Sequence, residues 1–517
     1  MREIELKLVL DAAQLRRLRA APAIRSMAAG PSQTRVLHSF YYDTDADDLK
    51  AAGIALRLRR IGRQWVQTVK RADSAMQSGL SQPIEIEFAV DGHKLALGRI
   101  PDHDLREELI GLSRDGLSVV AETKFKRTSR ILVPTDCVEI ELAIDAGQLI
   151  SGERAEDFVE AELELKRGSA ADLYKTAALL LTQGPVRYSV AAKSERARAL
   201  PHRDGPAATP LRKARPVRLN GGMSAEAAAM AIFREGIDHA LSNLARTIDS
   251  EDVNGPHQLR VGLRRLRSAF SAFRGVLGRG GLEPWAIKAR EIGAQAGALR
   301  DLDVMAFEIV APMIDRFPEE PGFQALHDAL VQRRREVFAK VRPWLAGKEA
   351  CDFAFGLPGF VEARGWLDAN DHDQTLRLAQ PVVPYAIKTL RKRWKAMAAY
   401  GSRIETLTVN ERHEMRKEIK KLRYVLDGFS SLFPSDSMAT FGKRVKQLQT
   451  SFGALNDSAM AEMILSAPDA PGADQPSVAR AAGRIIGHFL AEADREWPGA
   501  VANWQALSST PQPWRNL

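Results

Sequence analysis

The chain has 517 residues, of which 45% are hydrophobic and 27% charged, and its formal net charge is +9. This composition is typical of a globular protein with two or more domains and argues against extensive disorder. No apolar run approaches the length of a membrane span, and Glu3 and Glu5 lie where a signal peptide would need basic and then apolar residues. The two cysteines form no CxxC motif, which argues against a disulfide scaffold and favours a cytoplasmic location.

The charge is distributed unevenly along the chain. Residues 1–200 contain 30 Lys and Arg against 29 Asp and Glu, and the remainder contains 44 against 36. The excess in the second part favours an anionic partner without identifying it. Four prolines and two glycines between the two parts predict a linker at 201–221, which separates a domain at 1–200 from one at 222–510.

Short runs that alternate apolar and charged residues dominate residues 1–200, beginning with EIELK at 3–7. A strand there places Glu3, Glu5 and Lys7 on one face, with about 7 Å between the two carboxylates. One such run alone is most simply a solvated sheet face. The later runs, however, are almost purely acidic or purely basic. If they surround one lumen, the carboxylates suit a hard divalent cation and the arginines suit phosphate oxygens.

These residues resemble the signature of the CYTH, or triphosphate tunnel metalloenzyme, family. The motifs that carry the resemblance are EIELK at 3–7, YYDT at 41–44, ALRLR at 55–59, VQTVK at 66–70, AELELK at 161–166 and AAKSERA at 191–197. The resemblance implies a closed eight-stranded antiparallel β-barrel whose tunnel binds a triphosphate with Mg²⁺ or Mn²⁺. In one departure from the family pattern, Pro83 replaces the basic residue expected ahead of Glu85 and Glu87.

The resemblance also implies roles for individual side chains. The implied phosphate ligands are Lys7, Arg57, Arg59, Lys70, Arg127 and Lys193. The implied metal ligands are Glu3, Glu5, Glu141, Glu162 and Glu164. Glu3, Glu5 and Lys70 are expected to take part in catalysis, with a carboxylate positioning or deprotonating the attacking water.

The expected reaction is metal-dependent hydrolysis of inorganic triphosphate to diphosphate and phosphate. The family also includes thiamine triphosphatases, RNA triphosphatases and adenylate cyclases, and a cyclase would release cyclic AMP from ATP. Another alternative is a barrel without catalysis in a polyphosphate-binding protein of polyphosphate granules. The matching charged residues favour an enzyme over this alternative.

Helical periodicity replaces alternation after residue 222, and the second part of the chain repeats itself. HQLRVGLRRLRSAF begins at His257 and HEMRKEIKKLRYVL begins at His413, 156 residues later. GALRD, ending at Asp301, and GALND, ending at Asp457, have the same offset. The repeat predicts an all-α domain of two pseudo-symmetric four-helix units, so that the whole chain is an α+β multidomain protein.

Each repeat carries a histidine and three basic residues on one face of an amphipathic helix, opposite the apolar face. The two sets are His257, Arg260, Arg264 and Arg267, and His413, Arg416, Lys420 and Arg423. They could be solvated surfaces, but their repetition favours a binding function. The repeats resemble the CHAD domain, which implies that these eight residues bind inorganic polyphosphate.

Two other interpretations of the basic faces have less support. Aromatic residues do not alternate with the basic ones, which argues against single-stranded nucleic acid as the ligand. Neither histidine has an HxxxH or HxxE partner, which argues against a metal site. Asp301 and Asp457 either orient arginines or cap helices, and the sequence does not separate these roles.

Overall fold

The computed structural model describes residues 4–71, 79–81, 84–189, 191–202, 209–278 and 280–515. Glu3 and Pro83, which entered the sequence predictions, lie outside these residues. By contacts, the chain divides into two compact units. The first comprises Met1–Pro210 and Ala346–Gly365, and the second comprises Leu211–Leu345 and Trp366–Leu517. No described helix combines the length and the apolar character needed to span a bilayer.

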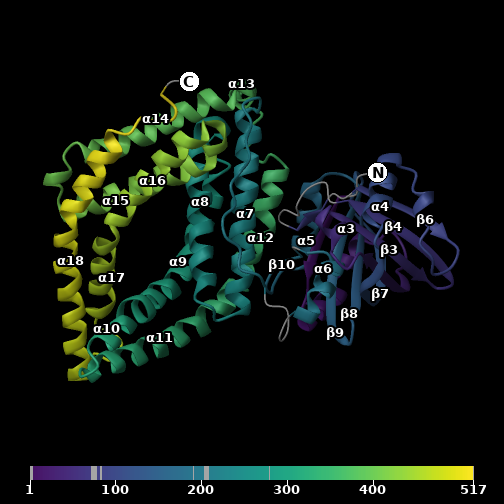
Figure 1. Ribbon diagram of the computed structural model, residues 1–517, viewed down its shortest axis with the longest axis horizontal. Helices are drawn as coiled ribbons and strands as arrows, with labels where there is room; N and C mark the ends of the chain where they lie inside the picture. The colour runs from purple at the N-terminus through teal and green to yellow at the C-terminus, as the bar shows by residue number, and fades with distance from the viewer. Residues whose placement is uncertain are drawn as a thin grey trace. The chain divides into compact units, whose positions relative to one another are not determined.

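The first unit is built on one antiparallel sheet of ten described strands (Figure 1). The strands are β1 (Glu5–Val9), β2 (Gln33–Asp43), β3 (Ile54–Ile61), β4 (Gln64–Arg71), β5 (Leu80–Ser81), β6 (Ile84–Val90), β7 (Ser118–Thr135), β8 (Val138–Ser151), β9 (Arg154–Arg167) and β10 (Arg187–Tyr188). Their order is β10-β1-β9-β8-β7-β2-β3-β4-β6, with β5 also paired to β1. Eight of them have five or more residues, which matches the predicted number.

The sheet is curled, because the consecutive strands β5 and β6 pair with strands at or near its opposite ends. β6 pairs with β4 at one end of the path, while β5, just before β6 in sequence, pairs with β1 near the other end. The alternation in β1 then has two consequences: Leu6 and Leu8 are fully buried on one face, and Glu5 and Lys7 lie on the other. The predicted fold class, a barrel-like antiparallel sheet followed by an all-helical domain, is confirmed.

Short helices cover this sheet, and one of them comes from much later in the chain. The helices are α1 (Ala12–Ala20), α2 (Pro22–Met27), α3 (Asp48–Ala51), α4 (His103–Leu112), α5 (Ala170–Leu180), α6 (Lys193–Arg198) and α12 (Lys348–Glu362), with 3₁₀ turns at Leu97–Arg99 and Leu200–His202. α12 packs against α5. Tyr188 donates a 2.7 Å hydrogen bond to the carbonyl of Ala354, and its ring lies 6.1 Å from that of Phe355. α12 therefore belongs to the first unit, although its residues fall within the predicted range 222–510.

The second unit is entirely helical in its described residues. Its helices are α7 (Ala225–Asp249), α8 (Asn254–Leu277), α9 (Glu283–Asp303), α10 (Ala311–Arg316), α11 (Pro321–Leu345), α13 (Gln374–Ala379), α14 (Val382–Gly401), α15 (Val409–Phe429), α16 (Ser435–Ser451), α17 (Gly453–Leu465) and α18 (Pro476–Ser508). A π-helix at Val304–Val310 joins α9 to α10, and 3₁₀ turns lie at Ile404–Thr406 and Ser430–Leu432.

The helix contacts follow the order expected of two repeats. α7, α8, α9 and α11 contact one another in succession, and α14 contacts α15, which contacts α16, which contacts α18. Corresponding helices also meet across the repeats, α8 with α15 and α11 with α18. At the starts of α7 and α14, Ala225 N–H donates to Gln380 O at 2.8 Å and Val382 N–H donates to Met223 O at 3.1 Å. Such reciprocal bonds are typical of a local two-fold relation.

Candidate functional site

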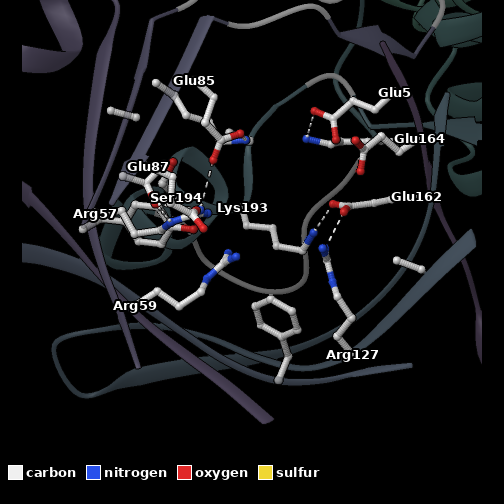
Figure 2. Close-up of a pocket in the computed structure, with 18 of the residues that line it drawn as sticks. Glu5, Arg57, Arg59, Glu85, Glu87, Arg127, Glu162, Glu164, Lys193 and Ser194 are labelled. Carbon is white, nitrogen blue, oxygen red and sulfur yellow. Dashed lines mark hydrogen bonds and ion pairs between the residues drawn. The ribbon is translucent and has the colours of Figure 1, made fainter. Parts of the chain in front are cut away.

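A cavity of about 240 Å³ lies within the curled sheet of the first unit (Figure 2). Its lining is dominated by charge, with equal numbers of cations and carboxylates. The cations are Lys7, Arg57, Arg59, Lys70, Arg127 and Lys193, which are the six predicted phosphate ligands. The carboxylates are Glu5, Glu85, Glu87, Glu141, Glu162 and Glu164. Every predicted barrel residue except Glu3, which lies outside the described residues, therefore lines one cavity.

Three adjacent strands bring carboxylates into a row. Glu164 on β9 is directly opposite Glu5 on β1 and Glu141 on β8. Like charges at such positions destabilise a sheet unless a cation lies among them. Lys166 supplies one, with its ammonium 2.5 Å from Glu164 and 3.4 Å from Glu141. Glu5 has Lys7 at 2.7 Å.

Glu162 lies at the centre of the most tightly paired group. Lys193 Nζ is 2.6 Å from its carboxylate, Arg127 donates to it, and Lys7 is opposite it on β1. Burial alone would raise the pKa of Glu162, but Lys193, Arg127 and Lys7 outweigh burial and hold the pKa well below its usual range. Burial also disfavours the charged form of Lys193 and by itself would lower its pKa, but Glu162, Glu160 and Asp145 raise the pKa overall. Both groups are therefore charged near neutral pH.

The opposite wall carries a second paired group. Lys70 Nζ lies 2.5 Å from Glu85, and Arg57 lies 3.4 Å from the same carboxylate and 3.6 Å from Glu87. Arg57 also donates a 3.1 Å hydrogen bond to Thr68 Oγ1. In Figure 2, Arg57, Glu85 and Glu87 face Glu5, Glu162 and Glu164 across the cavity, with Lys193 between them.

Arg59 differs from the other cations of the cavity. Among the described residues its guanidinium forms no ion pair, and it donates a 3.0 Å hydrogen bond to Ser39 Oγ. Burial, and then the neighbouring Arg57, lower the pKa of Arg59 to about 10. A partly buried guanidinium without an ion pair is stabilised by an anionic ligand.

Several residues of this site were not among the predicted ligands. Glu85 and Glu87 could have been found, because IEIEF alternates like the other acidic strands. Asp145 and Glu160 lie behind the lining and hold Lys193 at 3.0 and 2.5 Å. Their role depends on which strands are neighbours, and a single strand carries no signal for that.

The carboxylates fit a hard divalent cation by their chemistry. Glu5, Glu141, Glu162 and Glu164 offer the oxygen ligands that Mg²⁺ prefers, and they line a cavity that also contains phosphate-matching cations. Within the part of the chain that the structure describes, no three His, Cys, Asp or Glu side chains are already grouped closely enough to hold a metal. An ion there would draw its ligands away from the lysines that now contact them.

The eight predicted residues of the second unit lie on α8 and α15, two helices that contact each other. Burial, then Arg416, Arg264 and Arg260, lower the pKa of Lys420 to about 7, so the basic faces of both helices act on one ammonium. Burial, with Arg300 and Arg264, also lowers the pKa of His257.

The outer members of the two sets, Arg267, His413 and Arg423, also lie near other cations or an aromatic ring. Burial, followed by Arg290 and Arg264, lowers the pKa of Arg267. Burial, followed by Arg416, lowers the pKa of His413. Arg423 lies over the ring of Tyr424, 5.2 Å from its centroid. Asp301 accepts a 2.5 Å hydrogen bond from Arg260, which supports an orienting role over a cap.

Comparison with known proteins also divides the chain into two domains, although the second match includes α12, which belongs to the first unit by contacts. Residues 1–197 match the CYTH domain and residues 231–466 match the CHAD domain. The chain is 28% identical to an inorganic triphosphatase of Haemophilus influenzae over 169 residues, which are 32% of this chain and 46% of that protein. It therefore spans about half the length of this relative.

Two solved structures are also similar. The CHAD domain of the plant Ricinus communis is 23% identical with a TM-score of 0.50, over 58% of this chain and 98% of that one. A Hippeastrum protein described as having a dominant triphosphatase activity is 20% identical with a TM-score of 0.30, over 38% of this chain and 95% of that one. The family matches show a CYTH domain at residues 1–197, followed by a CHAD domain at residues 231–466.

Proposed function

We propose that the barrel hydrolyses the terminal phosphate of inorganic triphosphate in the presence of a divalent metal ion. The observation that carries the proposal is the balance of six cations and six carboxylates around one cavity. A free anion would meet as much repulsion as attraction there. A metal–triphosphate complex presents both signs and satisfies both sets of side chains. The similarity to an inorganic triphosphatase supports the same substrate.

The cations of the cavity would bind phosphate with different ease, because some of them are already in ion pairs. Arg59 is available without breaking an ion pair, so it is the first candidate to bind an incoming phosphate. Lys70 and Arg57 would follow, and then Arg127 and Lys193, which both contact Glu162. Each of the last four must exchange a carboxylate for a phosphate oxygen. Because phosphoryl transfer depends on positioning and charge neutralisation, this set suffices without a covalent intermediate.

The carboxylates would serve the metal and the water. A bound Mg²⁺ or Mn²⁺ would lower the pKa of water and neutralise phosphate oxygens. Glu162 and Glu164, with Glu5 and Glu141, would hold that ion. Glu5, with Glu3 beside it in the ExExK motif, would orient the attacking water and accept its proton.

We further propose that α8 and α15 bind inorganic polyphosphate and direct the protein to polyphosphate granules in the cytoplasm. α8 and α15 contact each other, and Arg260, Arg264 and Arg416 all lower the pKa of Lys420, which supports a cluster of cations across the two helices. Bringing an anion among them relieves their mutual repulsion. A linear polyanion matches such a row of charges.

Phosphate release from inorganic triphosphate tests the barrel proposal. We expect release with Mg²⁺, none with EDTA, and less release from ATP or thiamine triphosphate. Arg59→Ala should raise KM about tenfold or more, because it removes a charge-assisted contact to phosphate. Arg60→Ala is the matched control, since Arg60 is exposed and donates to Gly62 O. Unchanged kinetics of Arg59→Ala would contradict the assignment.

A further inference from the structure

The cavity of the barrel continues into a second chamber of about 370 Å³. The two share four lining residues, Arg59, Glu87, Arg127 and Glu141, so a ligand held by these residues can extend from one into the other. The second chamber contains none of the remaining predicted ligands. Its own polar lining includes Gln33 and Arg35 on β2 and Ser129 on β7.

The register of β2 and β7 places Arg35 on the face of the sheet that lines this chamber. Arg35 is directly opposite Arg127, and Gln33 is directly opposite Ser129, in the antiparallel pair of β2 and β7. Directly opposed residues share a face of the sheet, so Arg35 lies on the cavity side with Arg127. Arg35 is exposed, and among the described residues its guanidinium donates to Gln33 Oε1 at 3.2 Å and forms no ion pair.

The two opposed arginines, Arg127 and Arg35, differ in whether they form ion pairs. Arg127 is neutralised within the first cavity by Asp145, at 2.7 Å, and by Glu162. Arg35 has no such partner in the described structure, although it lies across the strand pair from a second guanidinium. Arg59 and Arg130, which also line the chamber, likewise form no ion pair among the described residues, so three of its four arginines can contact an anionic ligand directly.

The lining of the chamber favours phosphate over a nucleobase. Four of its twelve lining residues are arginines and two are glutamates. None of these twelve is aromatic, so the described lining offers no ring on which a base could stack. Arginine forks and the hydroxyl and amide of Ser129 and Gln33 match phosphate oxygens.

We propose that this chamber is a subsite for the fourth and later phosphates of a linear polyphosphate. The inference rests on the proposed function, because the first three phosphates would occupy the cavity described above. It makes Arg35 a residue that determines the preferred chain length. The barrel would then accept short linear polyphosphates beyond triphosphate, with the added phosphates held by Arg35 and Arg59.

Steady-state kinetics on inorganic triphosphate and tetraphosphate test this subsite in the full-length protein. We expect Arg35→Ala to raise KM for tetraphosphate about tenfold more than KM for triphosphate, because the lost contact reaches the fourth phosphate. Arg35→Lys should restore part of the difference. Arg60→Ala, on the neighbouring strand β3 and exposed, should change neither value. Equal effects of Arg35→Ala on both substrates, or no effect on either, would overturn the subsite.

Calorimetric titration separates this test from the hydrolysis proposal. If the protein releases phosphate from neither chain, the proposed function fails, and the binding of tri- and tetraphosphate to the wild type and to Arg35→Ala is compared instead. Binding by the helical unit is common to both proteins, so a difference between them reports on the barrel. A loss of affinity specific to tetraphosphate supports the subsite, and equal affinities overturn it.

Discussion

Lys193 holds together the most heavily charged part of the barrel, and its removal has a predictable cost. Its ammonium lies 2.5, 2.6 and 3.0 Å from Glu160, Glu162 and Asp145. The side chains of Lys193 and Glu162 are each 10% exposed, while Glu160 and Asp145 are almost completely buried. Arg127 and Arg196 also pair with these carboxylates. Three cations therefore balance three carboxylates, and Lys193→Ala leaves one buried negative charge uncompensated.

Breaking one partner of a buried ion pair costs about 3–5 kcal/mol. Because Arg127 and Arg196 remain in place, we expect the lower end, a loss of about 3 kcal/mol in the free energy of unfolding of the barrel. Hydrogen exchange of peptides from β9 measures this locally, separately from the helical domain. Lys175→Ala is the control, since Lys175 is 68% exposed and pairs with Asp172 at 3.4 Å, a contact worth less than about 1 kcal/mol.

Neutralising a partner of Lys193 provides a second check. Glu162→Gln in the Lys193→Ala background removes the unpaired charge, so it should recover part of the lost protection against exchange. If Lys193→Ala changes exchange in β9 no more than Lys175→Ala does, the carboxylates are solvated and the reasoning from buried charge is refuted.

Three further predictions follow from other parts of the structure. The pKa of Lys420 is about 7, so its ammonium is lost as the pH rises through this value, and polyphosphate binding by the helical domain should weaken between about pH 6 and pH 8. Lys420→Arg should flatten a binding titration over this range, because arginine keeps its charge. The pKa of Glu162 is depressed in the folded state, so the ionised carboxylate stabilises the barrel above the unfolded-state pKa of about 4.3. This stabilisation is lost as the pH falls below about 4.3. Glu162→Gln should therefore weaken the acid dependence of hydrogen exchange in β9. A fragment of residues 1–210 should unfold at a lower temperature than the barrel in the full chain, because it lacks the α12 contacts of Tyr188, and equal melting temperatures would contradict this.

The sequence predicted much of the fold because strand alternation and the 3.6-residue helical period can each be recognised within a short segment. Alternation placed Glu5 and Lys7 on one face of a strand, and the 156-residue repeat identified α8 and α15 as corresponding helices. The assignments of catalytic, metal-binding and polyphosphate-binding roles remain predictions, although the described barrel residues among them line a single cavity.

What the sequence could not reveal depends on partners far apart in the chain. From its sequence, α12 resembles one more helix of the helical domain, since it is rich in small and apolar residues and lies between helices of that domain. No local pattern states that these residues pack against α5 and β10, about 170 residues earlier. Asp145 and Glu160 were missed for the same reason: each is unremarkable on its own strand and acquires its role from Lys193 on α6.

The pairing of charges in the cavity also accounts for how such a polar interior can exist in a folded protein. Carboxylates buried without cations would be expensive, and so would the arginines and lysines. By mixing the two signs, the barrel keeps most of these groups ionised and paired. Under the proposed function, Arg59 and Arg35, which lack ion pairs among the described residues, are side chains that can bind a phosphate without breaking an ion pair. Under this proposal, a phosphate chain would therefore contact these unpaired cations before it displaces carboxylates from the paired ones.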